Sequence, residues 1–260
     1  MNRAFRAGAI GMLATFASLV AILVGADLLY LDPATLWNEI ADAETLFAIR
    51  LSLITASVTT ALAMALALPA AYALSRFKIP FAGVVDTLID LPIVLPPLLI
   101  GFSLLVVYQT TLGDLLVAGG LDLRYSVPGI VLAQFLVAAA FAIRTLKATF
   151  DSIDPRLEEV ARTLGATPAR AFIRVVLPLA RRGMVAGAVM TWARAIGEFG
   201  PILIFCGATR WRTEVLPIAI WLDFSVGKIE AAMALAVIML AISTLSLVAF
   251  KRLGGQGYLW

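Results

Sequence analysis

Histidine is absent from this sequence, and cysteine occurs once, as Cys206. A chain with a single cysteine forms no internal disulfide, and without histidine it lacks a common metal ligand and the usual base near neutral pH. Charged residues make up only 14% of the 260 residues. We therefore expect no metal site and no serine–histidine hydrolytic centre, and so low a charge content is unusual for a soluble domain.

A phosphate-binding loop of the form G-x-x-x-x-G-K-[ST] is also missing from the sequence. In that motif, backbone N–H groups of a glycine-rich loop hold the phosphates of ATP. We therefore expect this chain to bind no cofactor of its own, and any ATP hydrolysis that it depends on must occur in a partner.

Apolar residues dominate instead, at 62% of the chain, and the mean hydropathy is +0.98. A helix needs about 20 consecutive apolar residues to cross the hydrocarbon core of a membrane. Six runs have this length, and they do not alternate polar and apolar residues as the strands of a barrel do. We expect six membrane-spanning helices, within residues 8–29, 46–74, 84–108, 127–146, 183–206 and 229–250.

The first run follows two arginines, as a secretory signal does. It is longer than the apolar region of a typical signal, and no clear small-residue cleavage site follows it. We expect an uncleaved first membrane helix within residues 1–30.

Basic residues gather on one side of the expected membrane, in the terminal segments and in the connections after the second and fourth runs. The opposite side begins with the acids Asp32, Glu39, Asp42 and Glu44. Cytoplasmic loops of membrane proteins carry an excess of lysine and arginine. We therefore expect both termini and the loop between runs four and five to be cytoplasmic, and the pI of ≈ 9.2 requires no nucleic-acid partner.

The loop over residues 150–182 contains residues that typically begin and end two short helices. Asp154 is a suitable N-cap and Pro155 a suitable first residue for one helix, and Thr167 and Pro168 repeat this pairing for another. Gly165 lies between them, where a left-handed C-terminal cap is favourable for glycine. Apolar residues follow one stripe of the first helix, which we expect to pack on the membrane domain, and Pro178 is expected to bend or end the second helix.

Two interpretations of this loop stay open on physical grounds. It is either an interfacial helix that rests on anionic lipid or a docking surface for a cytoplasmic partner.

The loop resembles the EAA loop of ATP-binding-cassette (ABC) importer permeases, in which EAA is followed by three residues, Gly, nine residues, Ile, one residue and Leu-Pro. Val160 and Val175 depart mildly from this pattern. The resemblance implies a coupling helix that contacts a separate ATPase subunit. The residues it marks for coupling are Glu159, Ala161, Arg162, Leu164, Gly165 and Ala166, with Leu177 and Pro178 as support.

Most of the chain after the first run is similar to the molybdate, tungstate and sulfate branch of these permeases, notably "LIDLPIVLPPLLIGFSLL" and "WARAIGEFGPILIFCG". Pro201 stands where many members have alanine. The resemblance implies an all-α integral membrane protein with six transmembrane helices of the type I ABC importer permease (MetI-like) fold. Residues 46–250 are its core, and the cytoplasmic EAA loop at 150–182 lies within that core.

The resemblance also implies partners. They are two ABC ATPase subunits that bind ATP and Mg²⁺, an extracytoplasmic substrate-binding protein, and membrane lipid. A second copy of the chain is expected because no second six-span unit occurs in it. Import of a polyamine, iron or phosphate stays open, as do an ion-gradient-driven transporter and, less favoured, a membrane enzyme or scaffold.

Several polar residues and prolines interrupt the apolar runs. Arg194 and Glu198 lie four residues apart on one helical face, and we expect either a packing pair or an element of the pathway or gate. Gly197, Gly200, Pro96 and Pro97 permit close approach or bending beside such a pathway. Arg50 and Arg144 lie near helix ends, where they can reach the membrane surface, so no transport role is expected for either.

The outer connection from Ala208 to Lys228 contains Arg210, Trp211, Arg212 and Glu214 ahead of an apolar segment. It is expected either to dip toward the pathway, where the binding protein delivers its cargo, or to lie at the interface. No regulatory domain is expected after Trp260.

Overall fold

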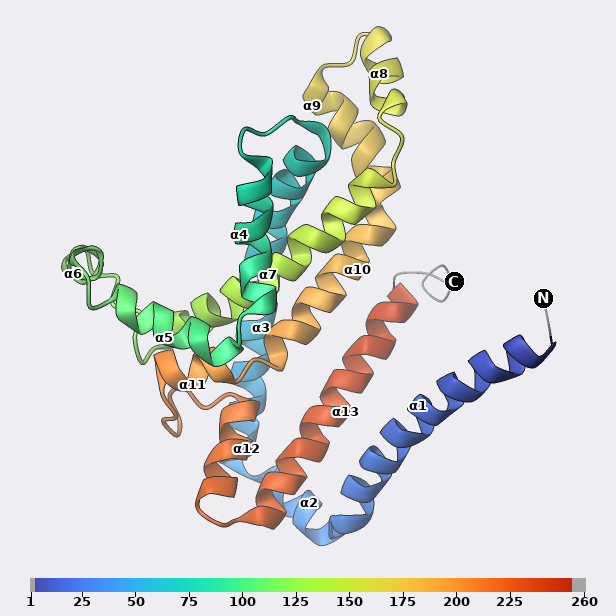
Figure 1. Cartoon of the computed structure of the whole chain (residues 1–260). Coiled ribbons are helices and arrows are strands. Elements are labelled where there is room, and N and C mark those ends of the chain that lie inside the picture. The colour runs from blue at the N-terminus through green and yellow to red at the C-terminus, as the bar shows by residue number, and fades with distance from the viewer. Residues whose placement is uncertain (1–2, 254–260) are drawn as a thin grey trace.

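The computed structural model describes residues 3–253, and the regular elements within that range are all helical (Figure 1). The predicted cytoplasmic ends at Met1 and Trp260 lie outside the described residues. The helices are α1 (Arg3–Tyr30), α2 (Pro33–Ala41), α3 (Ala43–Arg76), α4 (Ala82–Val94), α5 (Pro97–Val107), α6 (Thr111–Ala118), α7 (Val127–Asp151), α8 (Arg156–Thr163), α9 (Pro168–Ala171), the π-helical turn η1 (Phe172–Val176), α10 (Leu177–Ile196), α11 (Gly200–Cys206), α12 (Leu216–Ser225) and α13 (Ile229–Leu253).

Four of these helices are long and apolar enough to cross a membrane, namely α1, α3, α7 and α13. A fifth crossing arises if α4 and α5 are taken together, although the two are bent by 113°. The prediction of all-helical structure is confirmed, and the expected number of six crossings stays a prediction.

The run at residues 84–108 was expected to form one bent helix, but the structure divides it into α4 and α5. Pro96 and Pro97 follow Leu95, and a residue that precedes proline is pushed out of the helical region. Leu95 and Pro96 accordingly have extended ψ values of 139° and 129°. Two consecutive non-helical residues turn the chain through an angle much larger than a single-proline kink.

The run at residues 183–206 is also divided, because α10 ends at Ile196 and α11 begins at Gly200. A Cβ atom on Gly200 would lie 3.0 Å from the backbone nitrogen of Leu98. Helix α11 therefore packs closely against the start of α5, and the two interrupted segments lie beside each other.

The expectation that Pro178 ends its helix is wrong, because the helical path continues from α9 through η1 into α10. A bend of the helix at Pro178 stays a prediction. Proline lacks an N–H group and its ring clashes with the carbonyl four residues earlier in a regular helix. Here the Leu177 N–H donates to the carbonyl of Phe172, five residues back. The wider π turn accommodates Pro178 in the first turn of α10.

The core of the molecule lies where α3, α7 and α10 pack together (Figure 1). Small residues on α3, among them Ala63, Ala67 and Ala71, are fully buried against the larger Leu146 and Phe150 of α7. Small side chains let membrane helices approach closely where no hydrophobic force drives them together.

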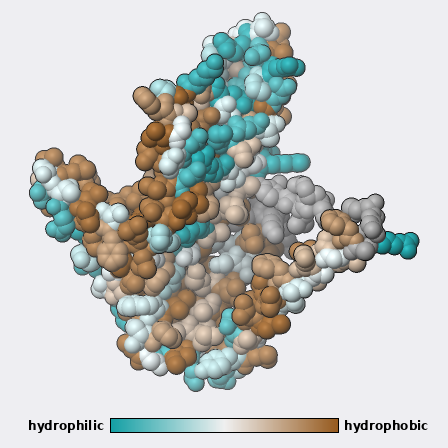
Figure 2. Space-filling view, viewed as in Figure 1, coloured by the Kyte–Doolittle hydropathy of each residue, from teal (hydrophilic) through white to brown (hydrophobic). Residues whose placement is uncertain are grey.

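Helix α1 stands apart from this core (Figure 1). Among the described helices, α13 is the one with which α1 makes its main contact. None of the most apolar 18-residue stretch of α1 is buried. Figure 2 shows that hydrophilic residues gather at the end of the molecule that carries α8 and α9, whereas hydrophobic residues cover the arm formed by α5 and α6.

Candidate functional site

The loop between α7 and α10 contains the two predicted helices, α8 and α9. Helix α8 ends at a left-handed Gly165, with φ of +88°. The N–H groups of Gly165 and Ala166 donate to the carbonyls of Arg162 and Ala161, at 3.0 Å each. This is the double hydrogen bond of a Schellman cap, and it confirms the conformation predicted for Gly165.

The predicted N-cap of α9 forms at Thr167, whereas α8 begins one residue later than predicted, with Pro155 rather than Asp154 at its N-cap position. The Asp154 carboxylate accepts the Arg156 N–H at 3.0 Å, and the Thr167 hydroxyl accepts the Arg170 N–H at 3.3 Å. These bonds satisfy backbone donors that a helix leaves free in its first turn. The loop is therefore an ordered element at the hydrophilic end of the molecule.

The apolar stripe of α8 faces outward, contrary to the expectation that it packs on the membrane domain. Leu157, Val160 and Leu164 are 46%, 57% and 83% exposed. The buried residue of α8 is Glu158, because Tyr72 and Arg76 of α3 bind its carboxylate. The residues marked for coupling lie together at this tip, where Glu159, Arg162, Leu164 and Gly165 are exposed and Ala161 and Ala166 half-buried.

The supporting residues Leu177 and Pro178 lie farther along the chain, at the start of α10. Leu177 is half-buried and Pro178 is exposed. The structure therefore places them at the base of the loop rather than at its tip.

Arg194 and Glu198 form an ion pair at the junction of α10 and α11, with 2.7 Å between Nη1 and Oε2. The Glu198 side chain is 2% exposed, whereas that of Arg194 is 29% exposed. The predicted pairing is thus confirmed, and its acidic member is the buried one. Glu198 acts as an internal counter-ion for a guanidinium that reaches a more open region.

The interrupted segments bring part of the predicted pathway set together. Gly200 contacts Leu98, which directly follows Pro96 and Pro97 in the chain. Gly197 is the C-cap of α10, and a Cβ atom added there would make only ordinary van der Waals contacts, at 3.6 Å or more. Gly200 therefore allows α11 to approach α5 closely, whereas Gly197 caps the C-terminal end of α10.

A buried amide stabilises the break after α10. Gln134 of α7 donates to the Ala195 carbonyl at 3.0 Å and accepts from the Thr59 hydroxyl of α3 at 2.9 Å. Non-helical backbone within a membrane requires such partners for its free carbonyls.

Arg144 was expected to reach the membrane surface, but the structure places its guanidinium between two carboxylates of α4. It donates to Asp90 at 2.5 Å and to Asp86 at 2.8 Å. None of the residues of α4 is buried, so this ion pair is a principal attachment of α4 to α7. Sequence spacing gave no sign of it because Arg144 lies more than 50 positions away in the chain.

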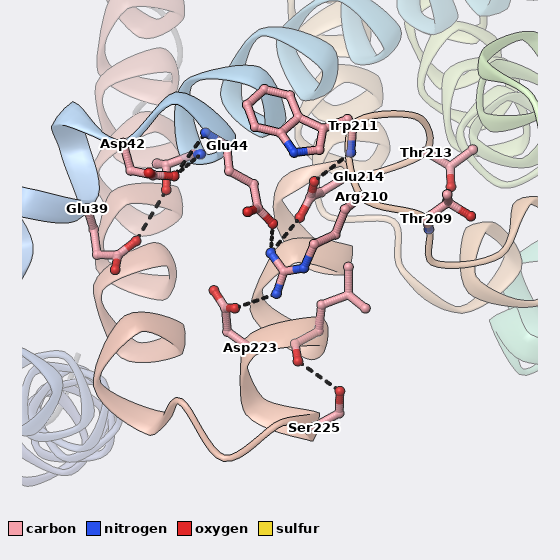
Figure 3. A network of polar contacts seen from close by, with 12 residues as sticks. Glu39, Asp42, Glu44, Thr209, Arg210, Trp211, Thr213, Glu214, Asp223 and Ser225 are labelled. Carbon is pink, nitrogen blue, oxygen red and sulfur yellow. Dashed lines mark hydrogen bonds and ion pairs between the residues drawn. The ribbon is translucent and has the colours of Figure 1, made fainter.

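At the opposite end of the molecule, Arg210 lies among three carboxylates (Figure 3). It pairs with Glu44 at the start of α3, with Glu214 at 3.3 Å, and with Asp223 of α12 at 2.7 Å. These residues line a cavity of ≈ 130 Å³. Within the predicted outer connection, Arg210 is therefore fastened to α3 and to α12, and α12 packs on α13 and α3.

Trp211 next to this network has a left-handed backbone, with φ of +61°. Its N–H donates to Glu214 at 2.9 Å (Figure 3). Its ring centroid lies 5.5 Å from that of Phe47. Left-handed non-glycine residues persist where surrounding contacts hold them. Arg212, the other cation predicted in this connection, is exposed.

Burial raises the pKa of Glu214 above the ordinary carboxyl value, although Arg210 and the Trp211 N–H act to lower it. Burial also raises the pKa of Glu39, and the negative charge of Asp223 adds to this effect. No group of three or more potential metal-ligating side chains occurs among residues 3–253. The network is a carboxylate clamp on the Arg210 guanidinium.

Comparison with known proteins agrees with this architecture. The chain is 36% identical to a probable molybdenum ABC transporter permease protein of Haloferax volcanii, over 89% of this chain and 84% of that protein. It is 36% identical to a molybdate/tungstate transport system permease protein of Thermococcus kodakarensis, over 86% and 85%. A sulfate transport system permease protein of Escherichia coli is 31% identical, over 85% and 80%.

The fold is similar to that of a chain in the crystal structure of a bacterial alginate ABC transporter in complex with an alginate-bound periplasmic protein. The TM-score is 0.75 at 18% identity, over 96% of this chain and 92% of that one. The pattern of one protein family matches residues 63–255. The chain therefore belongs to the family of binding-protein-dependent transport system inner membrane components, and it is a multi-pass membrane protein.

Proposed function

We propose that this chain is the membrane-spanning permease subunit of an ATP-driven importer for a tetrahedral oxyanion such as molybdate, tungstate or sulfate. The observation that carries the proposal is the ordered tip of α8, which exposes Leu157, Val160 and Leu164 at the hydrophilic end. An apolar patch on an ordered helix in such a place is typical of a protein contact. The names of the relatives support the oxyanion as substrate.

In this proposal the chain crosses the membrane six times, with α4–α5 and α10–α11 as two interrupted crossings. Helix α8 is the coupling helix on the cytoplasmic side, where both termini also lie. The basic residues of the loop, among them Arg156, Arg162, Arg170 and Arg174, support this orientation.

The complete importer contains two copies of the chain, two ATPase subunits that bind ATP and Mg²⁺, and one extracytoplasmic binding protein. The uncovered surface of α1 supports a second copy, because a helix with no buried residues in its apolar stretch leaves a face for another subunit. ATP binding closes the ATPase pair, and the two coupling helices convert this closure into opposite rigid-body motions of the membrane halves.

The pathway for the anion passes Arg194. A cation that is partly open while its counter-ion Glu198 is buried attracts an anion without leaving a carboxylate in its way. The adjacent breaks at Pro96–Pro97 and Gly197–Gly200 give this region the interrupted helices that line solute pathways.

The proposal is tested with Gly165→Asp in proteoliposomes that contain the permease, its ATPase and its binding protein. Gly120→Asp is the matched control, since both glycines have a positive φ and open space around the Cα. Gly165→Asp buries an unpaired carboxylate at the ATPase contact, so we expect molybdate uptake to fall by at least about tenfold, with Gly120→Asp close to wild type. Equal uptake by both variants would contradict the coupling role.

A further inference from the structure

The cytoplasmic end of α3 is joined to α8 by an ion pair, which we call the Glu158 brace and define as Tyr72, Arg76, Ile153 and Glu158. Tyr72 and Arg76 lie four residues apart and so share one face of α3. The Tyr72 hydroxyl donates to Glu158 Oε2 at 2.5 Å, and Arg76 Nε donates to Oε1 at 2.7 Å. A second Arg76 nitrogen donates to the Ile153 carbonyl at 2.8 Å, just ahead of α8.

The brace is shielded from solvent. The side chains of Arg76 and Glu158 are 10% and 12% exposed. The Tyr72 ring packs against three phenylalanines from other parts of the chain, with centroid distances of 4.5 to 5.8 Å; these are Phe77, Phe150 and Phe172. A buried ion pair with this many hydrogen bonds fixes geometry, because any displacement leaves a charge without a partner.

The two adjacent acids of α8, Glu158 and Glu159, differ in their exposure to solvent. Glu159 is exposed at the tip, among the residues expected to contact the ATPase, whereas Glu158 is buried against α3. One turn of helix thus presents apolar side chains outward and a carboxylate inward. The helix is suited to receive a displacement on one face and to pass it on from the other.

We propose that Glu158 and Arg76 are positioning residues that transmit the movement of the coupling helix to α3. This inference rests on the proposed function. Apart from the brace, α8 packs mainly on α9 and η1, which lead into α10. The brace adds a direct link from α8 to α3, so a push on α8 moves α3 and α10 together. Without the brace, α8 moves while α3 lags behind.

The test measures ATP hydrolysis and molybdate uptake in parallel, in proteoliposomes with the complete assembly. In Arg76→Ala we expect uptake to fall about tenfold with ATP hydrolysis largely retained, so that more ATP is consumed per anion. Arg76→Lys keeps the charge and restores part of the coupling. Lys78→Ala is the matched control, because it removes an exposed cation two residues from Arg76 and is expected to leave the ratio unchanged.

A double variant that carries no charge at the brace distinguishes a loss of coupling from a loss of folding. Arg76→Met combined with Glu158→Met replaces the ion pair by apolar side chains of similar volume, a change that folded proteins often tolerate. We expect this double variant to assemble and hydrolyse ATP but to stay uncoupled. A wild-type ratio of ATP to anion in it overturns the inference.

The outcomes also separate this inference from the proposed function. If Gly165→Asp abolishes uptake while the brace variants keep the wild-type ratio, the inference fails and the proposed function stands. If wild-type protein with its ATPase shows no uptake of any oxyanion, the proposed function fails.

Discussion

At the scale of single residues, the structure shows how acids are kept in a protein that contains few charges. Glu198 is buried beside Arg194, and Glu214 is buried beside Arg210. Each acid lies four residues from its cation, so a local pairing compensates the cost of burial. In Glu214 the compensation is incomplete, because its pKa stays above the ordinary carboxyl value.

This residual cost predicts a pH dependence of stability. A carboxyl group with a raised pKa in the folded chain binds more protons there than in the unfolded chain, in the pH window just above the ordinary glutamate pKa of 4.5. The free energy of unfolding therefore falls as the pH rises through this window, and Glu39 contributes with the same sign. We expect Glu214→Gln to have a shallower slope than wild type in thermal unfolding between about pH 5 and pH 7.

Asp122→Asn serves as the control for this experiment. Asp122 has a pKa lowered by its hydrogen bonds with Arg124, so it loses its charge below the window and its removal leaves the slope unchanged. Identical slopes for Glu214→Gln and wild type would show that Glu214 contributes nothing to the pH dependence.

Residues that interact within one helical turn were predictable, and residues that meet across the fold were not. The spacing of Arg194 and Glu198 indicated their pairing, and the position of Gly165 between two capped helices indicated its left-handed φ. Tyr72 and Glu158 are separated by 86 positions, and no periodicity connects them. The direction in which the apolar stripe of α8 faces was predicted wrongly. An apolar stripe indicates that a helix face can be buried, but it does not indicate whether the same chain or another protein buries it.

At the scale of elements, the apolar runs predicted where the helices lie but not which of them are interrupted. The stretch Leu95–Pro96–Pro97 forces non-helical backbone, yet the 113° angle depends on how α5 packs against α11. At Pro178 a helix end was predicted, but the chain stays helical because the wider π turn of η1 accommodates the proline. Whether a proline breaks a membrane helix is decided by the room that neighbouring helices leave for a wider turn.

Close packing of α7 and α10 predicts a sensitive glycine. A Cβ atom on Gly183 would lie 2.2 Å from the Thr149 hydroxyl and 2.8 Å from its Cβ, and rotation of the side chain does not remove the second contact. We expect Gly183→Ala to destabilise the protein by about 1–3 kcal/mol, visible as a lower Tm in detergent. Gly83→Ala, where nothing lies within 4 Å, should instead leave the Tm unchanged or raise it slightly.

At the scale of the whole molecule, both ends of α3 are fastened to functional loops. The brace holds one end of α3 through Arg76, and the clamp around Arg210 holds the other end through Glu44. Helix α1, within the part of the chain that the structure describes, contributes no residue to the brace or to the clamp. The chain therefore has a well-connected core and one apolar helix whose surface is largely uncovered.

This arrangement predicts contact between α1 and a second copy. Phe16 is 67% exposed on α1. In the complete assembly, Phe16→Cys labelled with a photoreactive maleimide is expected to yield a cross-linked product of twice the chain mass of 27.7 kDa. The same labelled chain, diluted in detergent until the copies separate, is the control, and an absence of dimer in the intact assembly would mean that lipid covers α1.

The position of Cys206 has a practical consequence. It is the only thiol in the sequence, and it is fully buried in the cluster between α5, α7 and α11. A maleimide or methanethiosulfonate reagent reaches a cysteine only where water or lipid does, so the folded chain offers such reagents little background reaction. Spin labels or fluorophores placed at introduced cysteines on α8 and α3 will therefore report those two positions alone, in an otherwise native sequence.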